Sequence, residues 1–387
     1  MSNFKFIVFI SLITLSGCSI NSNKEIPVIM PSATEGELSL ADIASDIKYL
    51  KLDNQRPIQK IMNVIKFDSL YFVQDLNGIY TYNLNGKFLY EIGKRGKAPG
   101  EYNFLNDIDF NDQDRKIYLL GDRKIYIYDV NGKYINSFPT YENERFDMIK
   151  YHDSKLVFPS AYNVAKPKLE HQWVITNIDG ETEYVKKDNT EEVQLGFSLK
   201  IKSCFDDDNK LCYWNQFNDT IFYVNDKGGQ PAYLFGKDEY RITQADMSKS
   251  ENAQSQSMWN LLSISGSKRY LILDYINIKE KARVQKVFDK KTGKVYELSR
   301  SELGKESNKC NTWDGGTGFN PGAKLSEKEG GWLVSWIDAY QLKAHVESES
   351  FKNSTPKYPE RKKELEQLAN SLNENDNPVL MIVKLKN

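Results

Sequence analysis

Short runs of apolar and aromatic residues alternate with polar turn residues along most of the chain, which is the pattern of successive β-strands. The clearest unit has strand patterns at Leu70–Val73, Gly78–Leu84 and Phe88–Ile92, with the turn Asn85-Gly86-Lys87 before the third. A second copy has them at Ile117–Leu120, Lys124–Val130 and Tyr134–Phe138, with the turn Asn131-Gly132-Lys133. Asn-Gly between two strand patterns is a strong hairpin signal, because both residues of that turn must take positive φ. Each unit therefore predicts a strand followed by a β-hairpin.

Four looser copies of this unit follow, beginning near Lys155, Lys210, Tyr270 and Gly331. Repeats of about 40–60 residues built from β-hairpins are typical of β-propellers. We therefore predict an all-β fold, a six-bladed β-propeller over residues 38–387. The early strand Ile47–Leu52 is expected to pair into the last blade, which closes the ring and hides its strand edges.

One segment of the last repeat has a helical pattern instead. Leu365, Leu368, Ala369 and Leu372 are spaced as on one helix face, and Pro359 stands where a first-turn proline is tolerated. This predicts a helical insert at about residues 339–375 in the last blade. An apolar stripe of this kind usually packs on the core, and a helix that binds a partner is the alternative.

The N-terminus has the pattern of a signal peptide over residues 1–17. Lys5 precedes the apolar run Phe6–Leu15, and small residues lead to Cys18. The run is shorter than the about 20 residues that a membrane-spanning helix needs. Residues 18–37, with several Asn, Ser and Pro, are expected to form a flexible tether.

Leu15-Ser16-Gly17-Cys18 resembles the lipobox of bacterial lipoproteins. The resemblance implies that Cys18 carries a lipid and anchors the protein to a membrane of the cell envelope. Because Ser19 rather than an aspartate follows the cysteine, we expect the outer membrane. An ordinary signal peptide with a chance cysteine is the alternative.

Composition narrows the classes of partner. Removing residues 1–17 takes away only Lys5, so 51 of the 52 Lys and Arg remain against 53 Asp and Glu. This near-balance gives no field that would attract nucleic acid. The 23 Tyr, 19 Phe and 6 Trp fit a folded β-rich protein.

Three cysteines remain besides Cys18, namely Cys204, Cys212 and Cys310. Cys204 and Cys212 flank a polar segment that reads as a hairpin turn, so they could form a disulfide across the two strands. A register slip of one residue would turn the two side chains to opposite faces instead.

The segment Ile92–Tyr102 resembles the signature loop of the six-bladed β-propeller lipoproteins of Bacteroidota, which are similar to NHL-repeat propellers. Asn375–Leu380 resembles the segment that closes the chain in that family, and Trp313-Asp314-Gly315-Gly316 with Pro321 resembles its late Gly-rich loop. The resemblance implies a propeller architecture and an envelope location, but it implies no reaction.

The sequence carries no motif for a catalytic, metal or cofactor site. His152, His171 and His345 are far apart and lack the spacing of metal ligands. No nucleophile elbow occurs, and the glycines at 93, 96 and 100 lack the Lys-Ser/Thr ending of a phosphate loop. We therefore predict no catalytic residue, no metal and no cofactor.

Five residues are candidates for ligand binding. Lys94 and Arg95, together with Lys97, could form a basic rim near the channel mouth for an anionic glycan or a peptide carboxylate, and Glu101 could instead simply hold the arginine in place. Trp313 lies in a Gly-rich loop rather than a strand pattern, next to Asp314, and could stack on a ligand. The alternative is that both loops are structural turns.

These patterns favour a non-catalytic ligand-binding or protein-interaction scaffold in the cell envelope, whose partner is a glycan, a peptide or an envelope protein. The alternative is a propeller hydrolase or lyase that uses channel-lining carboxylates and a divalent ion. Such an enzyme should concentrate His, Asp and Glu on the inner strands of successive blades, and the sequence pattern does not show this concentration.

Overall fold

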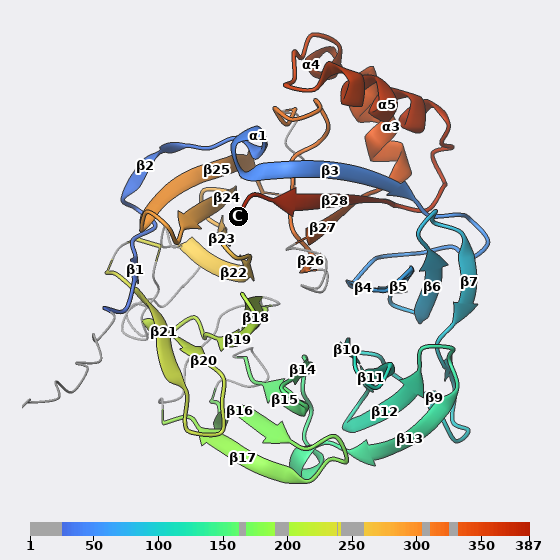
Figure 1. Cartoon of the computed structure of the whole chain (residues 1–387), viewed down its shortest axis with the longest axis vertical. Helices are drawn as coiled ribbons and strands as arrows, with labels where there is room; N and C mark the ends of the chain where they lie inside the picture. Colours follow the sequence, from blue (N-terminus) through green and yellow to red (C-terminus); the bar gives the residue numbers. More distant parts are fainter. Residues whose placement is uncertain are drawn as a thin grey trace, which may run out of the picture.

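A computed structural model of the chain describes residues 25–161, 168–189, 201–237, 239–240, 259–303, 310–324 and 332–387. Six sheets follow one another around a central axis, so the predicted six-bladed β-propeller is confirmed (Figure 1). The chain passes once around the ring, and the colours of Figure 1 follow it from blue to red. No helix within the described residues has the length and hydropathy that crossing a bilayer requires.

Each blade consists of four antiparallel strands, ordered from an inner strand near the axis to an outer strand. Blade one contains β4 (Asn63–Phe67), β5 (Leu70–Gln74), β6 (Ile79–Asn83) and β7 (Phe88–Glu91). Blade two contains β10 (Asp107–Asn111), β11 (Lys116–Leu120), β12 (Lys124–Asp129) and β13 (Tyr134–Pro139). Blade three contains β14 (Lys150–His152), β15 (Lys155–Pro159), β16 (His171–Thr176) and β17 (Thr182–Lys187). Blade four contains β18 (Cys204–Asp207), β19 (Lys210–Tyr213), β20 (Thr220–Tyr223) and β21 (Gln230–Phe235). Blade five contains β22 (Trp259–Gly266), β23 (Tyr270–Asn277), β24 (Ala282–Asp289) and β25 (Lys294–Glu302). Blade six contains β26 (Ala323–Lys324), β27 (Trp332–Ile337), β28 (Val379–Leu385) and β3 (Ala44–Lys51).

In blades one to four, the hairpin between the third and fourth strands is held by one Asn or Asp side chain, whose oxygen accepts two backbone N–H groups of the turn. In blade one, Asn83 Oδ1 accepts hydrogen bonds from the backbone N–H groups of Asn85 at 2.9 Å and Lys87 at 3.0 Å. Asp129, Asn177 and Asn225 do the same in blades two to four. Only Gly86, and not Asn85, takes positive φ, and the β6–β7 register shifts before the turn. The two Asn-Gly hairpins, in blades one and two, are therefore bulged turns, not the predicted turns with two left-handed residues.

The hydrophobic core lies between blades rather than inside one sheet. The six clusters of buried apolar side chains in the described residues each join successive blades. For example, Trp173 of blade three packs on Tyr213 of blade four, with ring centroids 5.2 Å apart. Every blade is thus stabilised by its two neighbours.

The last blade is completed by the early strand β3, as predicted. β3 pairs antiparallel with β28, from Lys51 opposite Val379 to Ala44 opposite Leu385. At one end of this pair, the buried Asn377 accepts from the Ile58 N–H at 2.8 Å and donates to two backbone carbonyls, Asp53 O and Arg56 O. These bonds fix the chain that leaves blade six to the chain that enters blade one.

The segment before β3 runs along the outer edges of the preceding blades. β1 (Val28–Ile29) pairs in parallel with β21 of blade four, and β2 (Thr34–Glu37) pairs in parallel with β25 of blade five. The short helix α1 (Leu40–Ile43) then leads into β3. The predicted tether over 18–37 is therefore wrong from residue 28 onward, because the outer strands offer unpaired N–H and C=O groups that this segment satisfies. Residues 1–24, including Cys18, lie outside the described residues.

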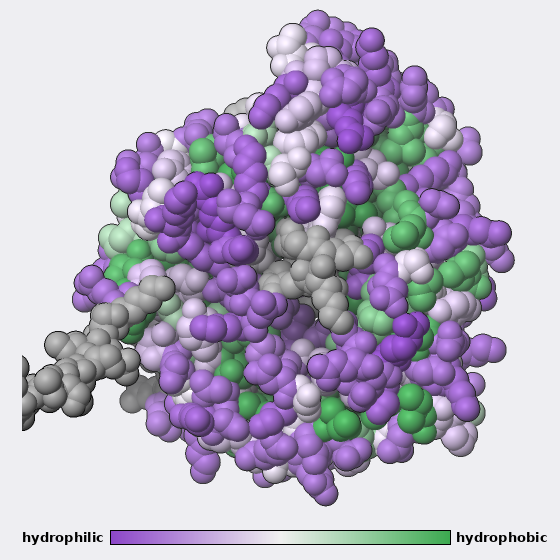
Figure 2. All heavy atoms as spheres, viewed as in Figure 1, coloured by the Kyte–Doolittle hydropathy of each residue, from purple (hydrophilic) through white to green (hydrophobic). Residues whose placement is uncertain are grey.

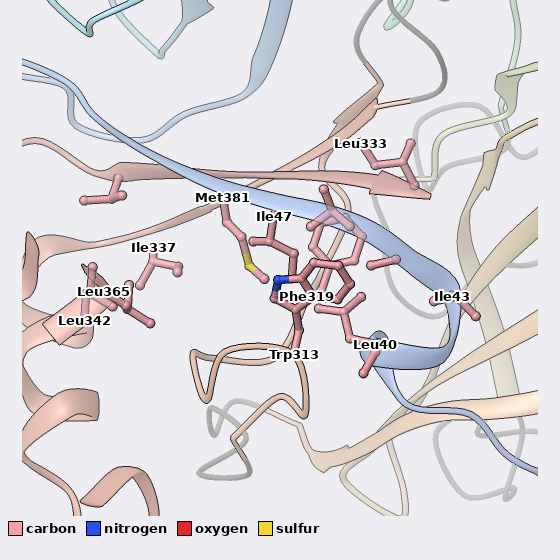
Figure 3. Close-up of a cluster of buried hydrophobic side chains, with 14 of the residues drawn as sticks. Leu40, Ile43, Ile47, Trp313, Phe319, Leu333, Ile337, Leu342, Leu365 and Met381 are labelled. Atoms are coloured by element: carbon pink, nitrogen blue, oxygen red, sulfur yellow. The ribbon is translucent and has the colours of Figure 1, made fainter. Parts of the chain in front are cut away.

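The predicted insert is present as helices between β27 and β28. They are α3 (Ala339–Glu347), α4 (Glu349–Lys352) and α5 (Pro359–Asn370), drawn beside β3 at the top of Figure 1. Leu365, Ala369 and Leu372 are buried against the propeller, so the apolar stripe packs on the core (Figure 3). Three short elements lie in connections: β8 (Lys94–Arg95), β9 (Glu101–Tyr102) and the 3-10 helix η1 (Tyr141–Asn143).

The hydrogen bonds of Asn377 give a test of ring closure. Asn377→Ala is expected to lower the free energy of unfolding by about 2–4 kcal/mol, because three backbone groups lose their partner. Urea unfolding followed by circular dichroism measures this. Asn370→Ala, at an exposed position of α5, is the matched control and should change stability by less than about 0.5 kcal/mol. Equal stability of the two variants would contradict the role given to Asn377.

Candidate functional site

The connections of the ring lie on two sides. Because neighbouring strands are antiparallel, the connections from strand two to three and from one blade to the next share one side, which we call the connection face. Figure 2 shows a surface covered mostly by hydrophilic side chains, with hydrophobic ones in small separate patches. The view therefore shows no broad apolar docking area.

A small pocket lies between blades four and five, among connections of this face. We call it the seam pocket. Its described lining is Trp214, Asn215, Gln216, Asn218, Phe235, Tyr240, Trp259, Leu261 and Tyr275. None of these described lining residues is charged, and five of them are aromatic. The described lining is therefore mostly apolar and carries no charge.

The strands of the two blades hold the aromatic rings in place. Trp214 follows β19 directly, and its Nε1–H donates to Lys202 O at 3.0 Å. Trp259 begins β22, and Tyr240 stacks on it with centroids 5.0 Å apart and planes at 22°. Tyr275 meets Tyr240 edge to face at 5.1 Å. The ring positions are thus set before any ligand arrives.

Asn215 supplies the polar group of the seam pocket. The residue is only 2% exposed, and its Oδ1 accepts the Phe217 N–H at 3.1 Å. Its Nδ2 has no hydrogen-bond partner among the described residues. A buried donor without a partner is costly and uncommon, so this amide is a ready donor for a ligand acceptor.

A cluster of charges lies on the inner strands. Asp107 and Asp109 of β10 accept the backbone N–H groups of Ile149 at 3.1 Å and Tyr151 at 2.7 Å. Burial raises the pKa of Asp109 to about 7, against the opposing effect of Lys150. Burial disfavours the charged ammonium of Lys150, but the carboxylates around it hold its pKa above the ordinary lysine value. The cluster ties blade two to blade three.

The same cluster bears on the enzyme alternative. Lys150 Nζ also lies 4.0 Å from Asp206 of blade four, so an ammonium stands among carboxylates of two other blades. Within the part of the chain that the structure describes, no three His, Cys, Asp or Glu side chains form a group that could hold a metal. The inner carboxylates thus act as acceptors for backbone and for Lys150.

A serine and a histidine of blade three and a glutamate of the connection before it lie, in turn, within hydrogen-bond distance of one another. Ser160 Oγ lies 2.8 Å from His171 Nδ1, and His171 Nε2 lies 3.3 Å from Glu144 Oε1. A serine nucleophile needs an accessible hydroxyl beside donors for an oxyanion. Ser160 and His171 are buried, and the Ser160 carbonyl accepts the Tyr213 hydroxyl at 3.1 Å. We therefore assign this group to anchoring the connection between β13 and β14.

Cys310 is also close to a histidine, but the pair is not set up for thiol activation. Its Sγ lies 3.9 Å from His345 Nε2 and 3.3 Å from Ser350 Oγ. His345 Nε2 donates to Gly315 O at 2.8 Å, so this nitrogen carries a hydrogen and cannot take the thiol proton.

The sequence profile of the family described as "Domain of unknown function (DUF4934)" matches residues 24–384. The chain belongs to the DUF4934 family. No curated protein is significantly similar to it. A crystal structure of a "Putative exported protein" from Bacteroides fragilis has a TM-score of 0.68 at 16% identity, over 93% of this chain and 100% of that one. A member of the DUF4221 family from Bacteroides vulgatus has a TM-score of 0.47 at 12% identity, over 89% and 98%. The first of these supports the fold alone.

The basic loop predicted from sequence is not at the channel. β8 and β9 pair in parallel, with Lys94 opposite Glu101, and Figure 1 shows β9 on the outer side of the ring. Lys94 and Arg95 are exposed, while Glu101 Oε2 accepts the Ala98 N–H at 2.9 Å. Gly93 allows close packing in this loop, because a Cβ at this position would lie 2.6 Å from Tyr128 Oη. A ligand role for Lys94, Arg95 and Glu101 stays a prediction.

Trp313 and Asp314 hold the insert to the ring. Trp313 is 4% exposed, lies in the cluster of Figure 3, and packs on Tyr358 with centroids 4.3 Å apart. Asp314 is buried and accepts from Asn311 Nδ2 and the Gly316 N–H, both at 2.8 Å; burial raises its pKa. The indole face is therefore covered by protein, unlike the open ring that the sequence predicts for stacking on a ligand.

The predicted disulfide between Cys204 and Cys212 is wrong. Both thiols are free, and the β18–β19 register places Cys204 opposite Tyr213 and Cys212 opposite Phe205. Because side chains alternate along a strand, the two cysteines point to opposite faces of the sheet. Cys204 joins the cluster shared with blade three, and Cys212 joins the one shared with blade five.

The seam pocket was not identified from the sequence. Trp214 and Trp259 look like blade core, and both are indeed almost fully buried. The available signal is the run Trp214–Asn218, which places a tryptophan and three side-chain amides in a turn. Neutral amides beside an aromatic residue in a connection are more informative than isolated basic residues.

The raised pKa of Asp109 gives a pH prediction. Its proton is held more tightly in the folded state, so its contribution to stability is present at low pH and lost as pH rises through about 7. The groups around it are Lys150, Asp206 and Asp107. The melting temperature of wild type should therefore fall more between pH 6 and pH 8 than that of Asp109→Asn, which keeps an acceptor for the Tyr151 N–H. Identical pH slopes would show that Asp109 does not titrate there.

Proposed function

We propose that this protein is a lipid-anchored ligand-binding propeller of the cell envelope, and that it binds a neutral ligand in the seam pocket without transforming it. The observation that carries the proposal is the unpaired Nδ2 of the buried Asn215 among fixed aromatic rings. A pocket with prepositioned rings and one free donor can orient a ligand at little cost in conformational entropy.

Three observations support the location. Residues 1–17 have the signal-peptide pattern, and Leu15–Cys18 resembles a lipobox. Residues 92–102 resemble the signature loop of propeller lipoproteins of Bacteroidota. The name of the Bacteroides fragilis neighbour, which shares the fold, also refers to export.

Binding is favoured over the hydrolase or lyase alternative by what the inner carboxylates contact. An acid and base pair needs one carboxyl free to meet a substrate. Asp107 and Asp109 instead accept backbone N–H groups of blade three, and Lys150 lies between them and Asp206. The seam pocket contains no described carboxylate at all.

The lipid anchor is tested on the protein expressed in a Bacteroidota host. Wild type should incorporate a labelled fatty acid and sediment with the outer membrane, because the acylated Cys18 inserts into it. Cys18→Ala should lose both properties. Cys310→Ala, which removes a thiol from the folded ring, is the control and should keep both. An unlabelled wild type would contradict the anchor.

Ligand binding is tested by thermal unfolding of the soluble mature chain. The panel comprises neutral disaccharides, blocked tryptophan dipeptides and nucleosides. One class should stabilise wild type, by about 2.7 kcal/mol at a ligand concentration of one hundred times Kd. Asn215→Ser should lose most of this gain, since serine can still accept the Phe217 N–H but lacks the amide donor.

Asn83→Ser is the matched control, because Asn83 accepts turn N–H groups in the same way on the opposite side of the ring. It should respond to ligand like wild type. If no class of compound stabilises wild type, the proposed function is wrong.

A further inference from the structure

We infer that residues 28–37, which we call the strap, form a latch on blades four and five. The strap detaches from their outer strands while the ring stays closed, and its detachment loosens the seam between the two blades. The detachment itself needs no ligand, whereas its effect on access to the seam pocket rests on the proposed function. Three observations carry the inference: the weak hold on the strap, its position at the seam, and its two contacts with the pocket wall.

Few interactions hold the strap to the two outer strands. On blade four, the Gly236 N–H donates to Ile29 O at 2.9 Å, and on blade five the Leu38 N–H donates to Glu297 O at 2.9 Å. Of the ten residues of the strap, only Ile29 and Pro31 are buried. A segment with so few buried contacts opens at a lower free energy than the core.

The strap crosses a seam that lacks a contact made at other seams. In blades one to four, a glycine of the hairpin between strands three and four lies so close to the preceding blade that a Cβ there would meet it. These pairs are Gly86 with Lys51, Gly132 with Glu91, Gly180 with Phe138 and Gly229 with Trp173. In blade five, no described atom lies within 4 Å of a Cβ built on Gly293. Instead Glu35 of the strap pairs with Lys294 of that hairpin at 3.2 Å. The strap therefore replaces the hairpin contact at the seam between blades four and five.

The first contact with the pocket wall is apolar. In the β1–β21 pair, Ile29 is opposite Phe235, which lines the seam pocket. Ile29 is fully buried and belongs to the same apolar cluster as Trp214 and Trp259. Release of β1 therefore exposes one side of this cluster to water and weakens the packing of the pocket wall.

The second contact is polar. Lys286 is only 3% exposed, and its ammonium donates to Thr34 Oγ1 of the strap and to Glu297, both at 3.0 Å. The same ammonium lies 5.1 Å from the ring of Tyr240, which lines the pocket. Release of β2 removes one acceptor of a buried charge, which favours a rearrangement of Lys286 and of the ring beside it.

The strap also lies between the proposed anchor and the ring. With a lipid on Cys18, a pull on the tether acts first on β1, because β1 is the first strand of the described chain. This strand pairs over two residues, whereas β3 behind it pairs with β28 from Ala44 to Lys51. The strap is thus expected to give way before the ring does.

Hydrogen exchange of the soluble mature chain, measured by mass spectrometry without ligand, tests the detachment. Amides of the strap should exchange at least about a hundredfold faster than those of the buried strands β15 and β23, because they open locally. Ile29→Ala should speed the exchange of the strap by about tenfold or more, since it truncates a fully buried side chain. Val28→Ala, at the exposed neighbouring position, is the matched control and should change this rate less than about twofold. A strap that exchanges as slowly as β15 and β23 is part of the cooperative ring, and the inference is then wrong.

A disulfide lock tests the link to the pocket. Val28 and Leu234 are paired in the register and neither side chain is buried, so Val28→Cys with Leu234→Cys can tie the strap to blade four. Oxidation should slow exchange of the peptides that contain Phe235 and Trp259 by about tenfold, and reduction should restore it. Unchanged exchange around Trp259 would show that the strap does not control the seam.

The same variant separates this inference from the proposed function. A compound that stabilises wild type should stabilise the reduced form more than the oxidised form. If it stabilises both equally, the latch does not control access and the proposed function stands. If the lock slows exchange but no compound of the panel stabilises wild type, the latch stands and the proposed function is wrong.

Discussion

The pairing of β3 with β28 is the constraint on which the rest of the structure depends. It joins strands that begin more than 300 residues apart along the chain, at Ala44 and Val379. Until it forms, blade six lacks its outer strand. Because the hydrophobic clusters lie between blades, an open ring would leave two of them facing water on one side. Closure therefore makes the six sheets one cooperative unit.

This architecture also explains where a binding site can form. A seam between blades is filled by face-to-face packing of aliphatic and aromatic side chains. Towards the connection face the sheets end, and the almost fully buried Trp214 and Trp259 line a small pocket there. Asn215, one of three amides in this lining, places a buried donor at the edge of the core. The cost is one buried donor that no described protein group accepts.

The fold could be predicted from the sequence because each repeat has a local pattern of apolar strand residues and turn residues. Strands two and three of a blade are rich in apolar and aromatic residues, and a turn with Asn or Asp and Gly follows strand three in most blades. The inner strands escaped prediction, since they are short and carry charges such as Asp107, Asp109 and Lys150 that face other blades. Their partners lie in other repeats, which a one-dimensional pattern does not record. The carboxylates that gather around Lys150 come from blades two and four, so this cluster could not be read from neighbouring repeats.

The details of the candidate sites could not be predicted, because they depend on strand register and on which side chains are buried. Cys204 and Cys212 flank a turn, but the β18–β19 register of one residue decides which face each thiol takes. Trp313 stands in a Gly-rich loop, yet the insert helices cover it. Asn215 is one of many polar turn residues in the sequence. It becomes distinctive only when Trp259, from the next blade, is placed beside it.

The N-terminal segment has a consequence for how the ring meets the membrane. β1 fixes Val28 to the outer edge of blade four, so with a lipid on Cys18 only ten residues separate the bilayer from the folded ring. Such a leash spans at most about 36 Å. The seam between blades four and five is then held within a few nanometres of the lipid headgroups. A ligand carried on the same membrane would meet it at an effective concentration in the millimolar range, so a weak site would still be occupied.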